Sequence, residues 1–313
     1  MSFFRFLLVA MLLAPAAHAE APRVATDIAP VHSLVGMVMS GVGTPDLIVS
    51  PGASPHGYAL RPSQARNLQR ADLVVWIGPE LTPWLAKPMA TLASDADQLE
   101  LLEAPGTQVL PFRDMGGDGD HDGDHDGDGD GDGHGHEGGH DHDGIDPHVW
   151  LDPENAVAWL AVIADHLARI DPDNADLYHA NAQAGQVELE QLQADLTAVL
   201  AGMQGKPIAT LHDAFQYFEA RFGLVSVGSV SLSDASDPGP AHLAQLRATL
   251  ADKGVTCAFA EPQFDPGLLE AAIESRDIKI ITLDPIGSQF EPGPGLYVDL
   301  LRDMGKAIAG CAE

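Results

Sequence analysis

Short β-type runs alternate with helix-type segments along most of this chain, and this alternation limits the folds it can adopt. In the first half, the expected strands cover residues 24–28, 46–49 and 73–77, with helical segments at 31–39 and 62–69. Strands that alternate with helices in this way are typical of βαβ units around a parallel sheet. The pattern therefore predicts an α/β fold.

A long helical segment divides the alternation into two halves. Asp171-Pro172-Asp173-Asn174 offers residues suited to capping a helix, and apolar residues near helical spacing continue to about Met203. About 30 helical residues would extend roughly 45 Å. Further expected strands follow at 207–211, 224–227, 255–260 and 278–283. We expect two parallel-sheet α/β lobes, residues 20–172 and 204–313, joined by one long spine helix at 173–203.

The first 19 residues have the pattern of a secretory signal peptide. Arg5 supplies a positive start, residues 6–13 are apolar, and Ala17-His18-Ala19 fits a small-x-small cleavage site. The apolar stretch is too short to span a bilayer. We expect an exported chain that begins near Glu20 and does not insert into the membrane.

Residues 116–144 contain 12 Gly, 10 Asp, 1 Glu and 6 His, with no apolar residue. The run contributes −11 to a formal charge of −30, and so acidic a chain is not expected to bind nucleic acid. Glycine makes ordering such a run costly, so we expect a disordered loop that binds several metal ions weakly. An inert acidic linker is the alternative. The candidate ligands are His121, His125, His134, His136, His140 and His142.

Three histidines outside this run stand beside ordered segments. His56 follows the expected strand at 46–49, His212 ends the strand at 207–211, and His148 lies just after the run. In open α/β sheets, ligands bind at the carboxyl ends of the strands. Three imidazoles with a carboxylate or water form a tetrahedral set well suited to Zn²⁺. Two acidic residues, Glu261 and Asp284, also end expected strands.

The chain has two cysteines, Cys257 and Cys311. In an oxidising compartment they would pair and close a long C-terminal loop. A thiolate metal site is less favoured, because the two residues are far apart and the chain has no Cys-x-x-Cys.

Several longer segments together resemble one known family. They are GASPHGYALRPSQARNLQRADLVVWIGPELTPWL, DPHVWLDPENA, TLHDAFQYFEARFGL, FAEPQF and LDPIG, and they occur in the family's order over essentially the whole chain after the signal segment. They resemble the ZnuA-type zinc-binding proteins of bacterial ABC importers. The resemblance implies two α/β lobes bridged by a long helix, with the metal in the cleft between them.

The resemblance also assigns roles to individual residues. Carried over by motif, the family's histidine ligands fall on His56, His148 and His212, and manganese-binding relatives typically have Glu where His212 stands. Some zinc members have an acidic residue just before the first histidine, where this chain has Pro55. The fourth ligand therefore falls to Asp284 or to water, with Asp284 preferred.

Three further features match the family's pattern. Glu261 is expected to orient His212 or a neighbouring hydroxyl group. Cys257 and Cys311 match the family's paired cysteines, which favours a disulfide. Residues 116–144 stand where zinc members often carry an insertion rich in histidine and acidic residues.

The function implied is that of a monomeric, non-enzymatic receptor that captures Zn²⁺ in the periplasm and delivers it to the membrane permease of an ABC importer. A periplasmic zinc buffer, a metallochaperone or an adhesin of the same fold is the alternative. A zinc hydrolase is less favoured, because the chain has no Gly-x-Ser-x-Gly motif and no Walker A sequence.

Overall fold

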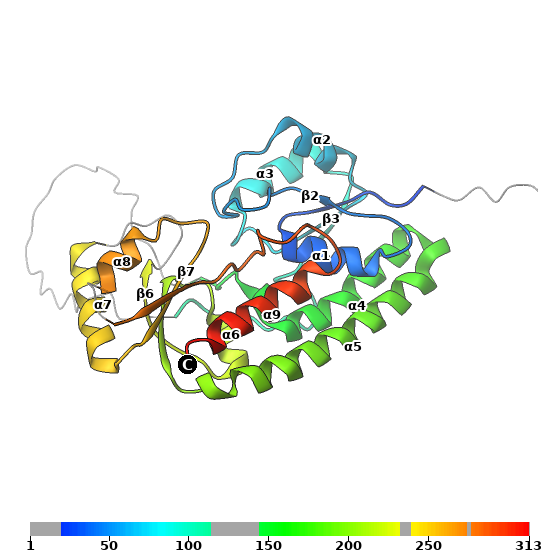
Figure 1. Ribbon diagram of the computed structural model, residues 1–313. Helices are drawn as coiled ribbons and strands as arrows, with labels where there is room; N and C mark the ends of the chain where they lie inside the picture. The colour runs from blue at the N-terminus through cyan, green and yellow to red at the C-terminus, as the bar shows by residue number, and fades with distance from the viewer. Residues whose placement is uncertain (1–19, 114–143, 232–238, 274–276, 313) are drawn as a thin grey trace, which may run out of the picture.

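Two parallel β-sheets, each of four strands, form the centres of two lobes in the computed structural model (Figure 1). The structure describes residues 20–113, 144–231, 239–273 and 277–312. The strand order is β2-β1-β3-β4 in the first sheet and β6-β5-β7-β8 in the second, so both lobes have the same topology. The predicted fold class is confirmed.

The N-terminal sheet has helices on both faces. Its elements are β1 (Val24–Thr26), α1 (Ala29–Val38), β2 (Asp46–Leu47), α2 (Pro62–Arg70), β3 (Leu73–Trp76), α3 (Pro83–Leu92) and β4 (Asp97–Glu100). Two further elements of this lobe come after the 116–144 run: the 3₁₀ turn η1 (Val149–Leu151) and α4 (Pro153–Ile170). Alternate residues of β3 point to opposite faces: Leu73 and Val75 pack with α1 and α4, whereas Val74 and Trp76 pack with α2 and α3. Burial on both faces explains why the predicted strand at 73–77 is continuously apolar.

Strand β4 was not identified in the sequence. Its residues are Asp-Gln-Leu-Glu, and of these Leu99 alone is buried. The strand lies at the edge of the sheet and pairs with β3 on one side. An edge strand needs few apolar residues, so hydrophobic pattern gives little signal for it.

The C-terminal sheet repeats this arrangement. Its elements are β5 (Pro207–His212), α6 (Gln216–Phe222), β6 (Val225–Ser231), α7 (Pro240–Lys253), β7 (Cys257–Ala260), α8 (Gly267–Ile273), β8 (Lys279–Thr282) and α9 (Leu296–Ala309). One face of β5, with Ala209 and Leu211, packs on α7 and α8. The opposite face belongs to a larger core that both lobes share.

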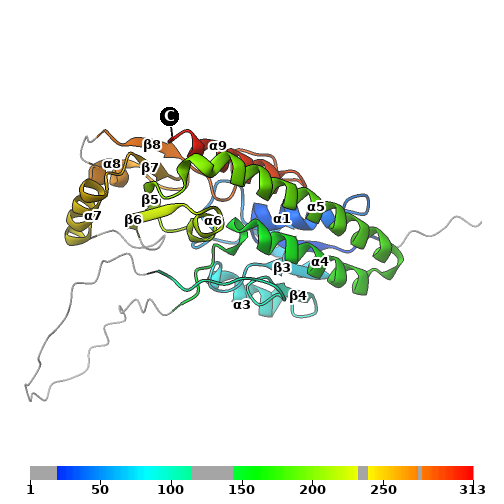
Figure 2. The same cartoon turned by 90° about the horizontal axis from the view of Figure 1, so that it is seen from below.

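The spine helix is α5 (Ala175–Leu200), which extends about 39 Å and is flanked by 3₁₀ turns at Pro172–Asn174 and Ala201–Met203 (Figure 2). The expected capping is not found, because the N-cap residue Asn174 makes no side-chain cap hydrogen bond. Instead the carboxylate of Asp171 accepts hydrogen bonds from Asn174 and from the Tyr178 hydroxyl, which fixes the turn into the helix. Within the described ranges, α5 and the other helices lack the combination of length and apolarity needed to cross a membrane.

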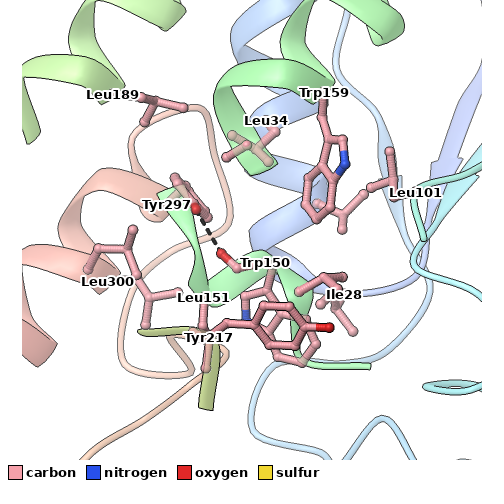
Figure 3. Packing of buried hydrophobic residues seen from close by; sticks show 14 of the residues in the cluster. Ile28, Leu34, Leu101, Trp150, Leu151, Trp159, Leu189, Tyr217, Tyr297 and Leu300 are labelled. Atoms are coloured by element: carbon pink, nitrogen blue, oxygen red, sulfur yellow. Dashed lines mark hydrogen bonds between the residues drawn. The ribbon is translucent and has the colours of Figure 1, made fainter. Parts of the chain in front are cut away.

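Helix α9 returns from the C-terminal lobe and packs on α1 and α5 (Figure 1). The Ser33 hydroxyl, on α1, donates to the carbonyl of Pro294 and accepts from the amide of Tyr297. In the shared core, the Tyr297 hydroxyl donates to the carbonyl of Trp150 at 2.7 Å (Figure 3). Packing along α5 and α9 therefore connects the lobes in addition to the chain itself.

A disulfide joins Cys257, the first residue of β7, to Cys311, just after α9, and the predicted pairing is confirmed. The bridge closes a segment with a sequence separation of 54. In the chain-entropy model such a loop is worth about 4 kcal/mol of stability before native-state strain. It anchors the end of α9 to the C-terminal sheet.

The pKa of Glu100, at the end of β4, predicts how the stability of the fold depends on pH. Its carboxylate lies over Gly78 beside that of Glu80, and burial, then Glu103 and Glu80, raise its pKa to about 7 from 4.5. A raised folded-state pKa means that stability is lost as pH rises from about 4.5 to 7. Glu100→Gln should therefore be more stable than the wild type at pH 8, by up to about 1 kcal/mol after solvent screening, and equal to it at pH 4.5.

Urea unfolding at the two pH values measures this difference. Glu190→Gln, at an exposed position on α5, serves as the control for replacing a carboxylate by an amide. Equal stability of Glu100→Gln and wild type at pH 8 would contradict the raised pKa of Glu100.

Candidate metal centre

His56, His148 and His212 come together in the structure. Each offers one ring nitrogen, and these atoms all lie within 4.8 Å of one another. In a tetrahedral zinc site, ligand nitrogens at about 2.0–2.1 Å from the metal lie about 3.4 Å apart, so a small inward movement would suffice. Among the described residues, this is the group of His, Cys, Asp and Glu side chains arranged to hold a metal ion.

The three histidines reach the cluster from different elements. His212 is the last residue of β5, His56 lies in the loop that leads from β2 to α2, and His148 directly precedes η1. His212 lies at the carboxyl end of a parallel strand, and the loop of His56 follows the carboxyl end of another, which is where ligands of α/β sheets bind. The cluster therefore joins candidate ligands from both lobes, with His56 and His148 from the first and His212 from the second.

Buried carboxylates orient two of the rings. Nδ1 of His148 lies 2.7 Å from Oδ1 of Asp146, which also accepts the backbone N–H of His148 at 3.0 Å. Nδ1 of His212 lies 3.5 Å from Glu261, at the end of β7. A carboxylate on Nδ1 fixes the tautomer that presents Nε2 to a metal and makes that nitrogen more basic. The position of Glu261 agrees with the orienting role implied by the resemblance.

The loop that carries His56 is fixed by polar contacts. The Trp84 indole N–H donates to the carbonyl of Pro55 at 2.7 Å, and the backbone N–H of His56 donates to the hydroxyl of Ser54. The Tyr58 ring packs against Trp84 at a centroid distance of 5.5 Å. Pro55 thus supplies a backbone anchor for this loop.

Aromatic side chains surround the imidazoles. The ring of Trp150 lies 5.3 Å from that of His148, and the ring of Phe264 lies 5.7 Å from that of His212. The Trp150 indole N–H donates to the carbonyl of Pro285 in the other lobe at 2.8 Å. Apolar walls lower the local dielectric, which strengthens the attraction between a cation and the nearby carboxylates.

Asp284 lies close to this pocket but outside the histidine cluster. Its Oδ1 accepts from Gln263 and from the backbone N–H of Ile286, and its Oδ2 accepts from both the backbone N–H and the hydroxyl of Ser288. Three of these hydrogen bonds lie within the loop after β8, and the fourth joins that loop to Gln263, which follows β7. In the described structure the carboxylate is therefore occupied by these four hydrogen bonds.

The six histidines of the 116–144 run lie outside the described residues. The ends of the run do not: the backbone N–H of Phe112 donates to Gly144, and that of Asp146 donates to Leu110, so a short antiparallel stem forms around the bridge between Pro111 and Ile145. This stem ends two residues before His148. The run is therefore attached directly beside the cluster.

Sequence reasoning missed three residues that support the centre. Asp146 orients His148, Trp150 links the lobes, and the Tyr217 hydroxyl, from α6, donates to the carbonyl of Asp146 at 2.8 Å. The Asp-Pro-His motif contained a signal for Asp146, because a carboxylate two residues before a candidate ligand can reach its ring. The contacts of Trp150 and Tyr217 are made between lobes and have no local sequence signal.

Comparison with known proteins identifies the family of this chain. Residues 24–311 match the family model described as zinc-uptake complex component A, periplasmic. The chain belongs to this family. It is similar to the high-affinity zinc uptake system protein ZnuA of Paracoccus denitrificans, with 48% identity over 94% of this chain and 93% of that protein. The ZnuA protein of Brucella abortus is 38% identical over 93% of this chain and 92% of its own length.

Solved structures of the ZnuA family and its neighbours share the fold. A crystal structure of ZnuA has a TM-score of 0.74 at 24% identity and covers 94% of this chain and all of that one. The zinc-binding protein TroA of Treponema pallidum has a TM-score of 0.73 at 19% identity, over 93% of this chain and 99% of that one. At these identities the comparison supports the two-lobe architecture.

Removing the Asp146 carboxylate tests the orientation of His148. Asp146→Ala deletes the acceptor for Nδ1 and should weaken binding of a divalent metal such as Zn²⁺ by about 10–100-fold. Asp146→Asn keeps an oxygen at the Oδ1 position and should weaken it less. Calorimetry with a competing chelator measures both. Unchanged affinity in Asp146→Ala would contradict an orienting role.

Proposed function

We propose that this protein is a high-affinity zinc receptor that captures Zn²⁺ through His56, His148 and His212 and delivers it to the membrane permease of an ABC importer. The observation that carries the proposal is the convergence of three imidazoles from both lobes, two of them held by buried carboxylates. The names of the ZnuA relatives as high-affinity zinc uptake proteins support the choice of metal and of transport. Three histidines also suit Zn²⁺ better than the harder cations, which prefer oxygen.

We further propose that water completes the coordination. Asp284 could become a ligand only by releasing hydrogen bonds to Gln263 or to Ser288, whereas water requires no rearrangement. An open fourth position also resembles a catalytic zinc site, so a zinc hydrolase is the rival. Turnover of ester or peptide substrates by the zinc-loaded protein would contradict the receptor function.

The proposed setting is the periplasm, where the family description places its members. In this proposal residues 1–19 are the export signal, residues 20–172 and 204–313 form the lobes, and residues 173–203 form the link. Because the lobes share one core along α5 and α9, we expect zinc to move them little. We expect the permease to recognise local changes around the cleft of a monomeric receptor. Capture of a membrane permease by the zinc-loaded protein would separate this function from that of a free zinc buffer.

The His- and Asp-rich run has a separate, auxiliary role in this proposal. The run offers 6 histidines and 11 acidic residues as potential ligands. It has no apolar residue that could pack and so fix the geometry of those ligands. It would therefore bind several zinc ions weakly and exchange them quickly. The short stem at 110–112 and 144–146 would keep those ions near His148.

Replacing one proposed ligand tests the main site. His212→Ala removes one of three imidazoles, so the tightest zinc binding should weaken by at least about 100-fold in competition calorimetry. His242→Ala is the matched control in the same lobe, since His242 contacts the carbonyl of Ser229 instead of the cluster. Tight binding retained by His212→Ala would show that the ligand assignment is wrong.

Deleting residues 116–144 tests the division of labour. The deletion should leave one tight zinc site and remove the weaker ones, because the three proposed ligands lie outside the run. Zinc titration followed by calorimetry resolves the two classes. Loss of the tight site would contradict the proposal, and an unchanged titration would support an inert linker.

A further inference from the structure

Arg113 is the last described residue before the 116–144 run, and its guanidinium group crosses to the other lobe. It forms ion pairs with Asp213 and with Glu219, whose side chains are 6% and 3% exposed. Asp213 directly follows His212, and Glu219 lies on α6. One side chain thus connects the root of the run to the segment that carries a proposed ligand.

The same region is connected to a second proposed ligand. Residues 110–112 pair with residues 144–146, and Asp146 in that stem orients His148. Helix α6 also contacts the stem, because the Gln216 amide donates to the carbonyl of Pro111 and the Tyr217 hydroxyl donates to that of Asp146. A continuous set of contacts therefore runs from His212 through Arg113 and the stem to His148.

The carboxylates around Arg113 repel one another. Burial, opposed by Arg113 and reinforced by Asp213 and Asp146, raises the pKa of Glu219 above its ordinary value. Removing the Arg113 cation would leave Asp213 and Glu219 as buried like charges between α6 and the stem. Breaking a buried ion pair in this way is strongly unfavourable and is relieved by movement of the charged segments apart.

We infer that Arg113 is a positioning residue of the metal centre, which holds His212 at its distance from His148 in the metal-free protein. The guanidinium suits this role because its planar fork can pair with two carboxylates at once, which a lysine cannot reproduce. The inference rests on the proposed assignment of these histidines as zinc ligands. It adds a determinant of zinc affinity that no ligand motif contains.

The test compares Arg113→Gln with Arg221→Gln. Arg221 lies on α6, as Glu219 does, and its side chain is 22% exposed against 23% for Arg113. It forms a two-pronged ion pair across the lobes with Asp152. Asp152 caps α4 and is separated from His148 by the turn η1, whereas Asp213 directly follows His212. The two arginines are therefore matched in exposure, but Arg113 pairs with two carboxylates and Arg221 with one. Both variants should lose thermal stability to a similar extent.

Zinc binding should separate the two variants. Arg113→Gln should raise the zinc Kd about tenfold, chiefly through faster release, whereas Arg221→Gln should stay within about twofold of the wild type. With one equivalent of Co²⁺, the visible spectrum reports the geometry of the ligands, and it should change in Arg113→Gln alone. A loss of thermal stability alone would not change that spectrum. If Arg113→Gln fails to fold, Arg113→Lys takes its place, with an expected increase in Kd of about threefold and a changed spectrum.

Three outcomes would overturn the inference. The Kd and cobalt spectrum could be unchanged in Arg113→Gln or, in its place, Arg113→Lys. Arg221→Gln could weaken zinc equally, which would indicate general coupling between the lobes. Tighter zinc binding in Arg113→Gln would show that Arg113 acts by long-range repulsion of the cation. Absence of tight zinc binding in the wild type would instead contradict the proposed function.

Discussion

A single apolar core that extends through both lobes is the constraint on which the rest of this structure depends. It includes one face of each sheet together with residues of α1, α4, α5 and α9. Because the proposed ligands come from both lobes, their separation is determined by how the lobes pack. A metal site divided between two loosely joined lobes would have to be assembled by the metal. Here the packing brings the imidazoles within a small movement of zinc geometry.

Polar contacts between the lobes determine their alignment more closely than the apolar core does. Trp150 illustrates this, because its ring contacts His148, its indole N–H binds Pro285 and its carbonyl accepts from Tyr297. Each such contact is made by a buried donor or acceptor that would cost energy if left unpaired. These groups therefore favour one alignment of the lobes over neighbouring alignments. The core supplies most of the free energy that holds the lobes together, and the polar contacts determine how the lobes are aligned.

The sequence predicts the positions of the histidines better than the groups that hold them. His212 follows a run of β-type residues, so its place at a strand end could be inferred from local pattern. The spine helix was predicted, but the capping expected from residues 171–174 was wrong, because Asn174 makes no side-chain cap hydrogen bond and Asp171 accepts from Tyr178. Arg113 gave no signal, because its partners lie about 100 residues further along the chain. Contacts between distant segments depend on the tertiary fold, and one sequence has no period that reveals them.

The three proposed ligands differ in how firmly the protein holds them, and this bears on how zinc could leave. His148 and His212 are 3% and 4% exposed, and each has a carboxylate beside Nδ1. His56 is half-buried, on a loop anchored by the backbone contact between Pro55 and Trp84. Separating the lobes would break the shared core, whereas moving the His56 loop would break a few hydrogen bonds. Displacement of His56 is therefore the least costly way to open the site.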